Sequence, residues 1–197
     1  MADPLYLSLW YADFGPTEML RHTIAVMKQF PFSQQRPGVT YLTLHPVSWS
    51  EPTILENRFE PGISPAEAVL FAADLLNEDY AYVFTAHWDL WTPDERTGNW
   101  FSTPRPVKFT AQGRQFEDET CQETGNLQVD FGLDTPFLYE NLQLRDEADV
   151  RVRMNIQKLV EFIIKVEKNT GATGRLLWSE SEDNLAQKLI DRLQKVQ

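Results

Sequence analysis

Residues 80–91 (YAYVFTAHWDLW) alternate between two kinds of side chain with a period of two along their whole length. Only an extended strand places alternate side chains on opposite sides of the backbone. One side is apolar and carries Tyr82, Phe84, Ala86, Trp88 and Leu90. The other side is half polar and carries Val83, Thr85, His87, Asp89 and Trp91. Such a strand is typical of the inside of an antiparallel sheet with one face in the core and one face toward solvent.

The rest of the chain supplies further strands and four amphipathic helices. Alternation predicts strands at about 5–11, 39–47, 100–101, 107–110, 114–116, 127–133 and 175–178. Helical periodicity predicts helices at about 16–30, 64–77, 148–168 and 185–196. Residues 48–63 show no clear period. Strands that cluster in the middle of the chain and helices that follow them predict an α+β fold, a mostly antiparallel twisted sheet with helices packed on one face.

Two of the helices carry strong local signals. Ser64 and Glu67 form a capping box around Pro65, which suits the first helical position. The helix at 148–168 has one apolar stripe with alternating steps of four and three, made of Val152, Ile156, Leu159, Ile163 and Val166. A stripe with this spacing predicts one buried helix face.

The length of 197 residues suits one domain that spans 1–197, with a strand-rich part at 1–144 and a helical C-terminal part at 145–197. No run of about 18 apolar residues occurs, so we expect no membrane span. The N-terminal residues lack the positive charge of a signal peptide. Because Cys121 is the single cysteine, no internal disulfide can form, and a cytoplasmic location is expected.

The net charge of −11 is distributed unevenly along the chain. Residues 1–144 contain 20 acids and 8 bases, whereas residues 145–197 contain 9 acids and 10 bases. The densest acidic run is Glu117, Asp118 and Glu119, followed by Glu123. An acidic surface repels phosphate backbones, which argues against nucleic acid as a partner. It attracts a basic partner protein, although excess acid also serves solubility alone.

His87 and Asp89 are the most chemically capable pair in the sequence. Residues two apart on a strand share a face, so His87 could act as a general base that Asp89 orients. His45, near the end of the preceding strand, would face His87 if the two strands are neighbours. The alternative is a polar sheet residue that pairs with Asp89 or solvent. Three scattered histidines make a weak metal site, and no metal is expected.

The sequence contains no cofactor or nucleophile signature. Cys121 lies between Glu119 and Glu123, where negative charge disfavours the thiolate. No G-x-S-x-G sequence is present, and the glycines of 171–174 follow a helix rather than a strand. We therefore expect no cofactor.

Two tryptophans, Trp91 and Trp100, bracket a polar loop that contains Asp94 and Glu95. Exposed tryptophan is a frequent interface hot spot, although both rings could instead close the sheet over its core. We therefore expect a non-catalytic, acidic protein-binding domain, of the immunity or inhibitor type, that acts on a basic partner. The expected partner-binding residues are Trp91, Asp94, Glu95, Trp100, Glu117, Asp118 and Glu119. The alternative is a small-molecule-binding or hydrolytic enzyme that uses the His87/Asp89 face; the oligomeric state is left open.

Overall fold

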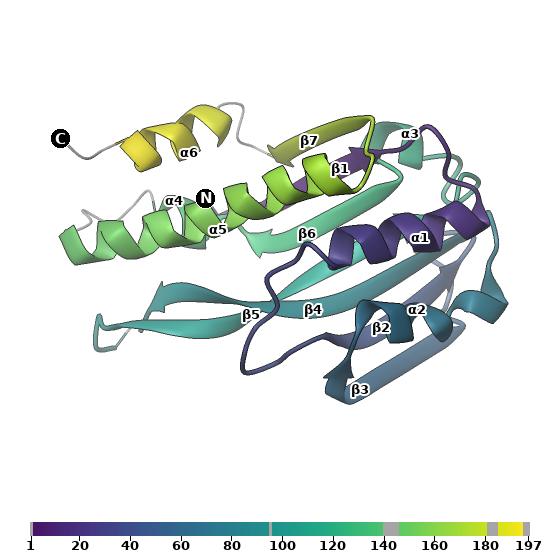
Figure 1. Cartoon of the computed structure of the whole chain (residues 1–197), viewed down its shortest axis with the longest axis horizontal. Coiled ribbons are helices and arrows are strands. Elements are labelled where there is room, and N and C mark those ends of the chain that lie inside the picture. The colour runs from purple at the N-terminus through teal and green to yellow at the C-terminus, as the bar shows by residue number, and fades with distance from the viewer. Residues whose placement is uncertain (1, 95, 140–145, 181–184, 195–197) are drawn as a thin grey trace.

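The strands form one seven-stranded sheet in the order β3-β2-β4-β5-β6-β1-β7 (Figure 1). The computed structural model describes residues 2–94, 96–139, 146–180 and 185–194. Every neighbouring pair of strands is antiparallel. The strands are β1 (Pro4–Trp10), β2 (Val39–Pro46), β3 (Leu55–Ile63), β4 (Tyr80–Pro93), β5 (Trp100–Gln112), β6 (Leu127–Leu133) and β7 (Gly174–Ser179).

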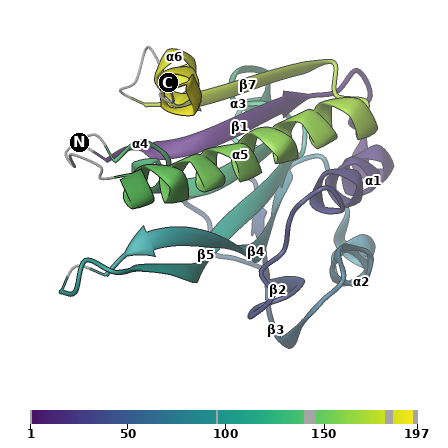
Figure 2. The same ribbon diagram turned by 60° about the vertical axis from the view of Figure 1, so that its left-hand side comes forward.

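The helices cover one face of this sheet, as Figures 1 and 2 show. They are α1 (Pro16–Met27), α2 (Pro65–Leu70), α3 (Cys121–Thr124), α4 (Thr135–Leu138), α5 (Asp146–Asn169) and α6 (Leu185–Gln194), with a 3-10 turn, η1, at Ala73–Leu75. The long helix α5 crosses the middle of the sheet, and α6 lies beside α5 and β7. The predicted α+β fold, with an antiparallel sheet and helices on one face, is confirmed.

The core lies between this helical layer and the apolar side of β4. Trp88 is fully buried, and its ring packs against Phe30, Phe131 and Phe137. The apolar stripe predicted for α5 is also buried in the same cluster. Burial of both predicted faces explains why α5 and β4 pack together. Of the helices in the described parts of the chain, none has both the length and the apolar character needed to cross a bilayer.

Several predicted element bounds require correction. The capping box at Ser64 is present, but α2 ends at Leu70 rather than at about residue 77. Residues 114–116 lie in turns instead of a strand. β5 is one continuous strand that joins the two short pieces predicted at 100–101 and 107–110. β3 was missed because it is an edge strand whose side chains are mostly exposed, so its sequence lacks an apolar alternation.

Candidate functional site

His87 lies on the face of β4 opposite Trp88, and it takes part in a chain of hydrogen bonds. Its Nε2 is 3.2 Å from Nη1 of Arg36, and its Nδ1 is 3.4 Å from Oγ1 of Thr40. Because a guanidinium only donates, Nε2 is the acceptor, and the proton is on Nδ1. The hydroxyl of Thr40 in turn donates to the carbonyl of Thr85. Burial, followed by the positive charge of Arg36, lowers the pKa of His87. The imidazole is therefore neutral, with both nitrogens engaged.

Asp89 shapes the loop between α1 and β2. Its carboxylate accepts from the hydroxyl of Ser33 at 2.6 Å and from the backbone N–H of Gln34 at 3.0 Å. The backbone N–H of Ser33 donates to the carbonyl of His87 at 2.7 Å. No hydrogen bond between His87 and Asp89 is formed. Each residue instead holds a different part of the same loop.

His45 and His87 do not face each other, although β2 and β4 are neighbours as predicted. Across the two strands His45 is paired with Ala81, and the pairing ends at Val39 and Ala86, before His87. The register shift between Val39 and Tyr41 contributes to this offset. In the described part of the chain, no group of three or more histidine, cysteine, aspartate or glutamate side chains gathers in a way that would hold a metal ion.

The edge of β4 beyond Ala86 is covered by polar side chains of α5. Oδ1 of Asn155 accepts from the backbone N–H of Trp91 at 2.9 Å, and its Nδ2 donates to the carbonyl of Trp91 at 2.8 Å. Nζ of Lys158 donates to the carbonyl of Asp89. A bare strand edge invites pairing with another chain. These contacts take the place of a neighbouring strand.

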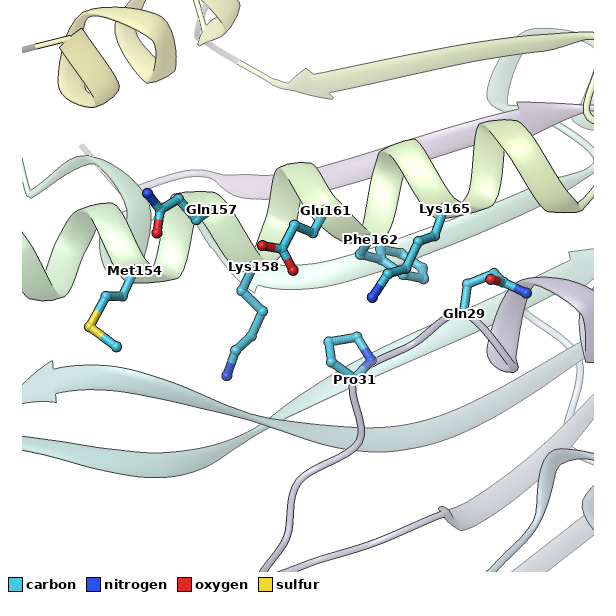
Figure 3. A pocket seen from close by; sticks show the side chains of 8 residues that line it. All are labelled: Gln29, Pro31, Met154, Gln157, Lys158, Glu161, Phe162 and Lys165. Atoms are coloured by element: carbon cyan, nitrogen blue, oxygen red, sulfur yellow. The ribbon is translucent and has the colours of Figure 1, made fainter.

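A hollow of about 220 Å³ lies between α5 and the turn after α1 (Figure 3). In Figure 3 the side chain of Lys158 extends from α5 toward the strands below. Burial lowers the pKa of Lys158, whereas the carboxylates of Asp89 and Glu161 raise it. Neither His87 nor Asp89 lines this hollow.

Trp91, Asp94 and Trp100 are held by contacts within the chain. The guanidinium of Arg151 lies 3.8 Å from the centroid of the Trp91 ring, and Trp100 packs edge-on against Tyr139 at 5.2 Å. The carboxylate of Asp94 accepts from two backbone N–H groups and one hydroxyl of its own loop, which lower its pKa. Glu95 lies outside the described residues.

Glu117, Asp118 and Glu119 lie at the other end of the sheet. β4 pairs with β5 from Ala81–Gln112 at one end to Pro93–Trp100 at the other. At about 3.3 Å per residue, the 14 residues of β4 separate the two groups by about 40 Å. In Figure 1, α3 and the end of the β4–β5 hairpin accordingly lie on opposite sides of the molecule. The structure does not bring the six expected partner-binding residues that it describes into one patch.

The acidic run lies in the connection after β5, and hydrogen bonds join it to the turn after β2 and to the residues just before β4. We call this region the acidic end (residues 47–51, 78–79 and 113–123). The backbone N–H of Glu117 donates to the carbonyl of Val47 at 2.8 Å, and that of Val47 donates to the carbonyl of Asp79 at 2.7 Å. The carboxylate of Glu117 accepts from the backbone N–H of Trp49 at 2.8 Å. The N–H of Gln115 donates to the carbonyl of Glu78 at 2.8 Å.

An exposed tryptophan therefore lies in a part of the chain that is rich in carboxylates. The side chain of Trp49 is 45% exposed, and one edge of its ring packs against the buried Phe116 at 4.9 Å. Val47, which is 54% exposed, lies two residues away. The acidic end carries seven carboxylates and one arginine, namely Glu51, Glu78, Asp79, Glu117, Asp118, Glu119, Glu123 and Arg114.

Sequence reasoning missed the place of Trp49, because it lies in the stretch without a period. The residue that holds it, Glu117, is 68 positions away in the chain. Only the pairing of β2 with β4 and of β4 with β5 brings the two connections together. An isolated tryptophan in a polar turn was the one available signal.

Cys121 is a buried residue of the acidic end, with 3% of its surface exposed. Burial, followed by the negative charge of Glu119, raises the pKa of its thiol. Both effects oppose formation of the thiolate, as the sequence indicated.

Comparisons of the chain with protein-family models, curated protein sequences and solved structures find no significant match in any of the three. The fold defines an α+β protein.

Proposed function

We propose that the chain is a non-catalytic binding protein that uses the acidic end to hold a basic partner protein. The observation that carries this proposal is the bond between the Glu117 carboxylate and the backbone of Trp49. It joins an aromatic residue that is 45% exposed to the acidic run that contains Glu117, Asp118 and Glu119. Aromatic anchors with a charged surround are typical of interfaces that bind tightly and associate fast.

The contacts of His87 and Asp89 favour binding over catalysis. A general base needs a free nitrogen within reach of a substrate proton. In His87, Arg36 and Thr40 occupy both nitrogens. Asp89 is turned to Ser33 and Gln34, so it does not orient the ring.

Asp118 and Glu119 are exposed, and no hydrogen bond joins either carboxylate to Trp49, so they can be changed to test the proposal. Asp118→Asn with Glu119→Gln removes two charges, and both replacements keep the side-chain shape and leave the Trp49–Glu117 bond in place. The matched control, Glu161→Gln with Asp191→Asn, removes the same charge from the exposed faces of α5 and α6. The partner is first isolated by co-purification from the native host, and its affinity is then measured by titration calorimetry at several salt concentrations.

We expect the acidic-end variant to bind at least tenfold more weakly at low salt, with a smaller salt dependence than the wild type. Trp49→Ala should weaken binding by a similar or larger factor because hot-spot truncations cost 2 kcal/mol or more, about thirtyfold. The helix control should bind like the wild type. Equal loss in both charge variants, or a partner without a basic surface, would overturn the proposal.

A further inference from the structure

The sheet divides where β5 passes the end of β6. β5 pairs with β6 only from Lys108 to Ala111, whereas its pairing with β4 continues to Trp100. Figures 1 and 2 show the β4–β5 hairpin extending beyond the other strands as a separate arm. β6 turns away at Gly132, whose φ of +76° suits glycine and whose backbone N–H bonds to Asp130.

Two prolines explain why the strands separate at this point. Pro104 and Pro106 lie in β5 opposite Asp89 and His87. The carbonyl of His87 accepts from the backbone N–H of Ser33, and the carbonyl of Asp89 accepts from Nζ of Lys158, so both point away from β5. When two opposite residues of an antiparallel pair do not bond to each other, the backbone groups of both point away from the pair. The backbone groups of Pro104 and Pro106 therefore point toward β6. Proline has no N–H to offer β6 there, so pairing stops.

A hollow of about 440 Å³ lies in this fork. We call it the fork pocket, and its main lining residues are Leu90, Thr92, Arg105, Phe131, Leu133 and Tyr139. Its size is within the usual range of about 300–1,000 Å³ for small-molecule sites. A dry cavity of about 150 Å³ holds a benzene molecule, so the fork pocket has room for a substituted ring.

Arg105 is the charged group of this pocket. It is exposed and forms no salt bridge with a carboxylate of the described residues. Burial raises the pKa of the Tyr139 phenol to about 12, although the positive charge of Arg105 lowers it in part. The phenol therefore keeps its proton at neutral pH and can donate a hydrogen bond. A cation that has no carboxylate partner among the described residues lies beside a phenol donor and an apolar wall. This combination matches an anion with an apolar body.

We propose that the fork pocket binds a small aromatic carboxylate, with its ring against Tyr139 and its carboxylate on the guanidinium of Arg105. Phe131 lies at the base of the pocket, 3% exposed and stacked on Trp88, so the half-buried Tyr139 supplies the aromatic surface. An aromatic lining favours a ring over an alkyl chain. A planar guanidinium favours a carboxylate, because the two groups form paired hydrogen bonds. The site is independent of the acidic end, which lies at the opposite end of β4.

The test uses the full chain and two fluorinated probes, 4-fluorophenylacetate and its neutral amide, 4-fluorophenylacetamide, in a ¹⁹F NMR titration. Arg105→Gln removes the cation, and Leu133→Glu places a negative charge in the pocket at a residue that is 54% exposed. Arg58→Gln removes an exposed cation from β3 and is the matched control. Thermal unfolding of each variant verifies that it is folded.

We expect the wild type to bind the carboxylate at least tenfold more tightly than the amide, because the charged pair is lost in the amide. Arg105→Gln and Leu133→Glu should each lower the affinity for the carboxylate by tenfold or more, whereas Arg58→Gln should not change it. The proposal is overturned if the wild type shows no saturable binding, if the amide binds equally well, or if either Arg105→Gln or Leu133→Glu retains wild-type affinity.

Discussion

Nη1 of Arg36 lies 3.2 Å from Nε2 of His87, and this contact is compatible only with a neutral imidazole. If His87 took up a proton, two donors and two positive charges would face each other across that distance. The loop that Arg36 belongs to would then lose one of its attachments to β4. His87 is thus a structural residue whose neutral form the fold requires.

We expect the protein to lose stability when the pH falls below about 6.5, the pKa of an unperturbed histidine. Burial and Arg36 lower the pKa of His87 in the folded chain. Below pH 6.5 the unfolded chain therefore binds a proton that the folded chain does not. The contribution of His87 to the free energy of unfolding is complete above pH 6.5. It is lost as the pH falls through the folded pKa, and the free energy of unfolding then changes by up to about 1.4 kcal/mol per pH unit. Urea unfolding between pH 7.5 and 5 measures this slope.

The control for this prediction is His87→Gln, whose amide can donate to Thr40 and accept from Arg36 without titrating. Burial also lowers the pKa values of His22 and His45, so part of the pH dependence should remain in the variant. An identical slope in the variant and the wild type would show that His87 is not responsible.

Asn155 should be the most sensitive polar residue of α5. It is 1% exposed, and its side chain bonds to both backbone groups of Trp91 and to the carbonyl of Pro136. Asn155→Ala leaves those groups buried without partners, and we expect a loss of about 2–4 kcal/mol in the free energy of unfolding. Gln157→Ala, on the exposed side of the same helix, should cost less than about 0.5 kcal/mol. A loss below 1 kcal/mol for Asn155→Ala in urea unfolding would contradict this role.

Gly113 should resist substitution because two connections meet there. A Cβ at this position would lie 2.2 Å from the carbonyl oxygen of Glu78, whereas one at Gly174 would lie 3.5 Å from the nearest atom of Trp10. We therefore expect Gly113→Ala to lower the free energy of unfolding by about 1–3 kcal/mol, the usual cost of overpacking. Gly174→Ala should be tolerated within about 0.5 kcal/mol. Equal unfolding midpoints for the two variants would disprove the steric conflict.

The fold was largely predictable because its main elements carry their own periodicity. The alternation at 80–91 places β4 inside a sheet, and the stripe from Val152 to Val166 places α5 over it. Both patterns arise because one side of the element is buried, and they can be recognised within a short stretch of sequence. β3 was not predicted because its side chains are mostly exposed, so its sequence has no apolar alternation.

The candidate site was less predictable because it depends on which connections meet. Trp49 and Glu117 are brought together by strand register, which a single sequence does not specify. The same is true of Arg36, which lies in a polar loop without a motif and reaches His87 across 51 positions. The prolines that flank Arg105, in contrast, are a local feature of the sequence that matches the point where β5 stops pairing with β6.

Cys121 should react very slowly with thiol reagents while the protein is folded. Its side chain is 3% exposed, and burial and Glu119 raise the pKa of the thiol. Because the thiolate is the nucleophile, we expect iodoacetamide to modify the native protein at least 100-fold more slowly than the protein in 8 M urea, as followed by mass spectrometry. Glu119→Gln should accelerate the native reaction only slightly, since burial is the larger of the two effects. A native rate within tenfold of the unfolded rate would show that the segment around Cys121 opens readily, and the acidic end would then lack a rigid base.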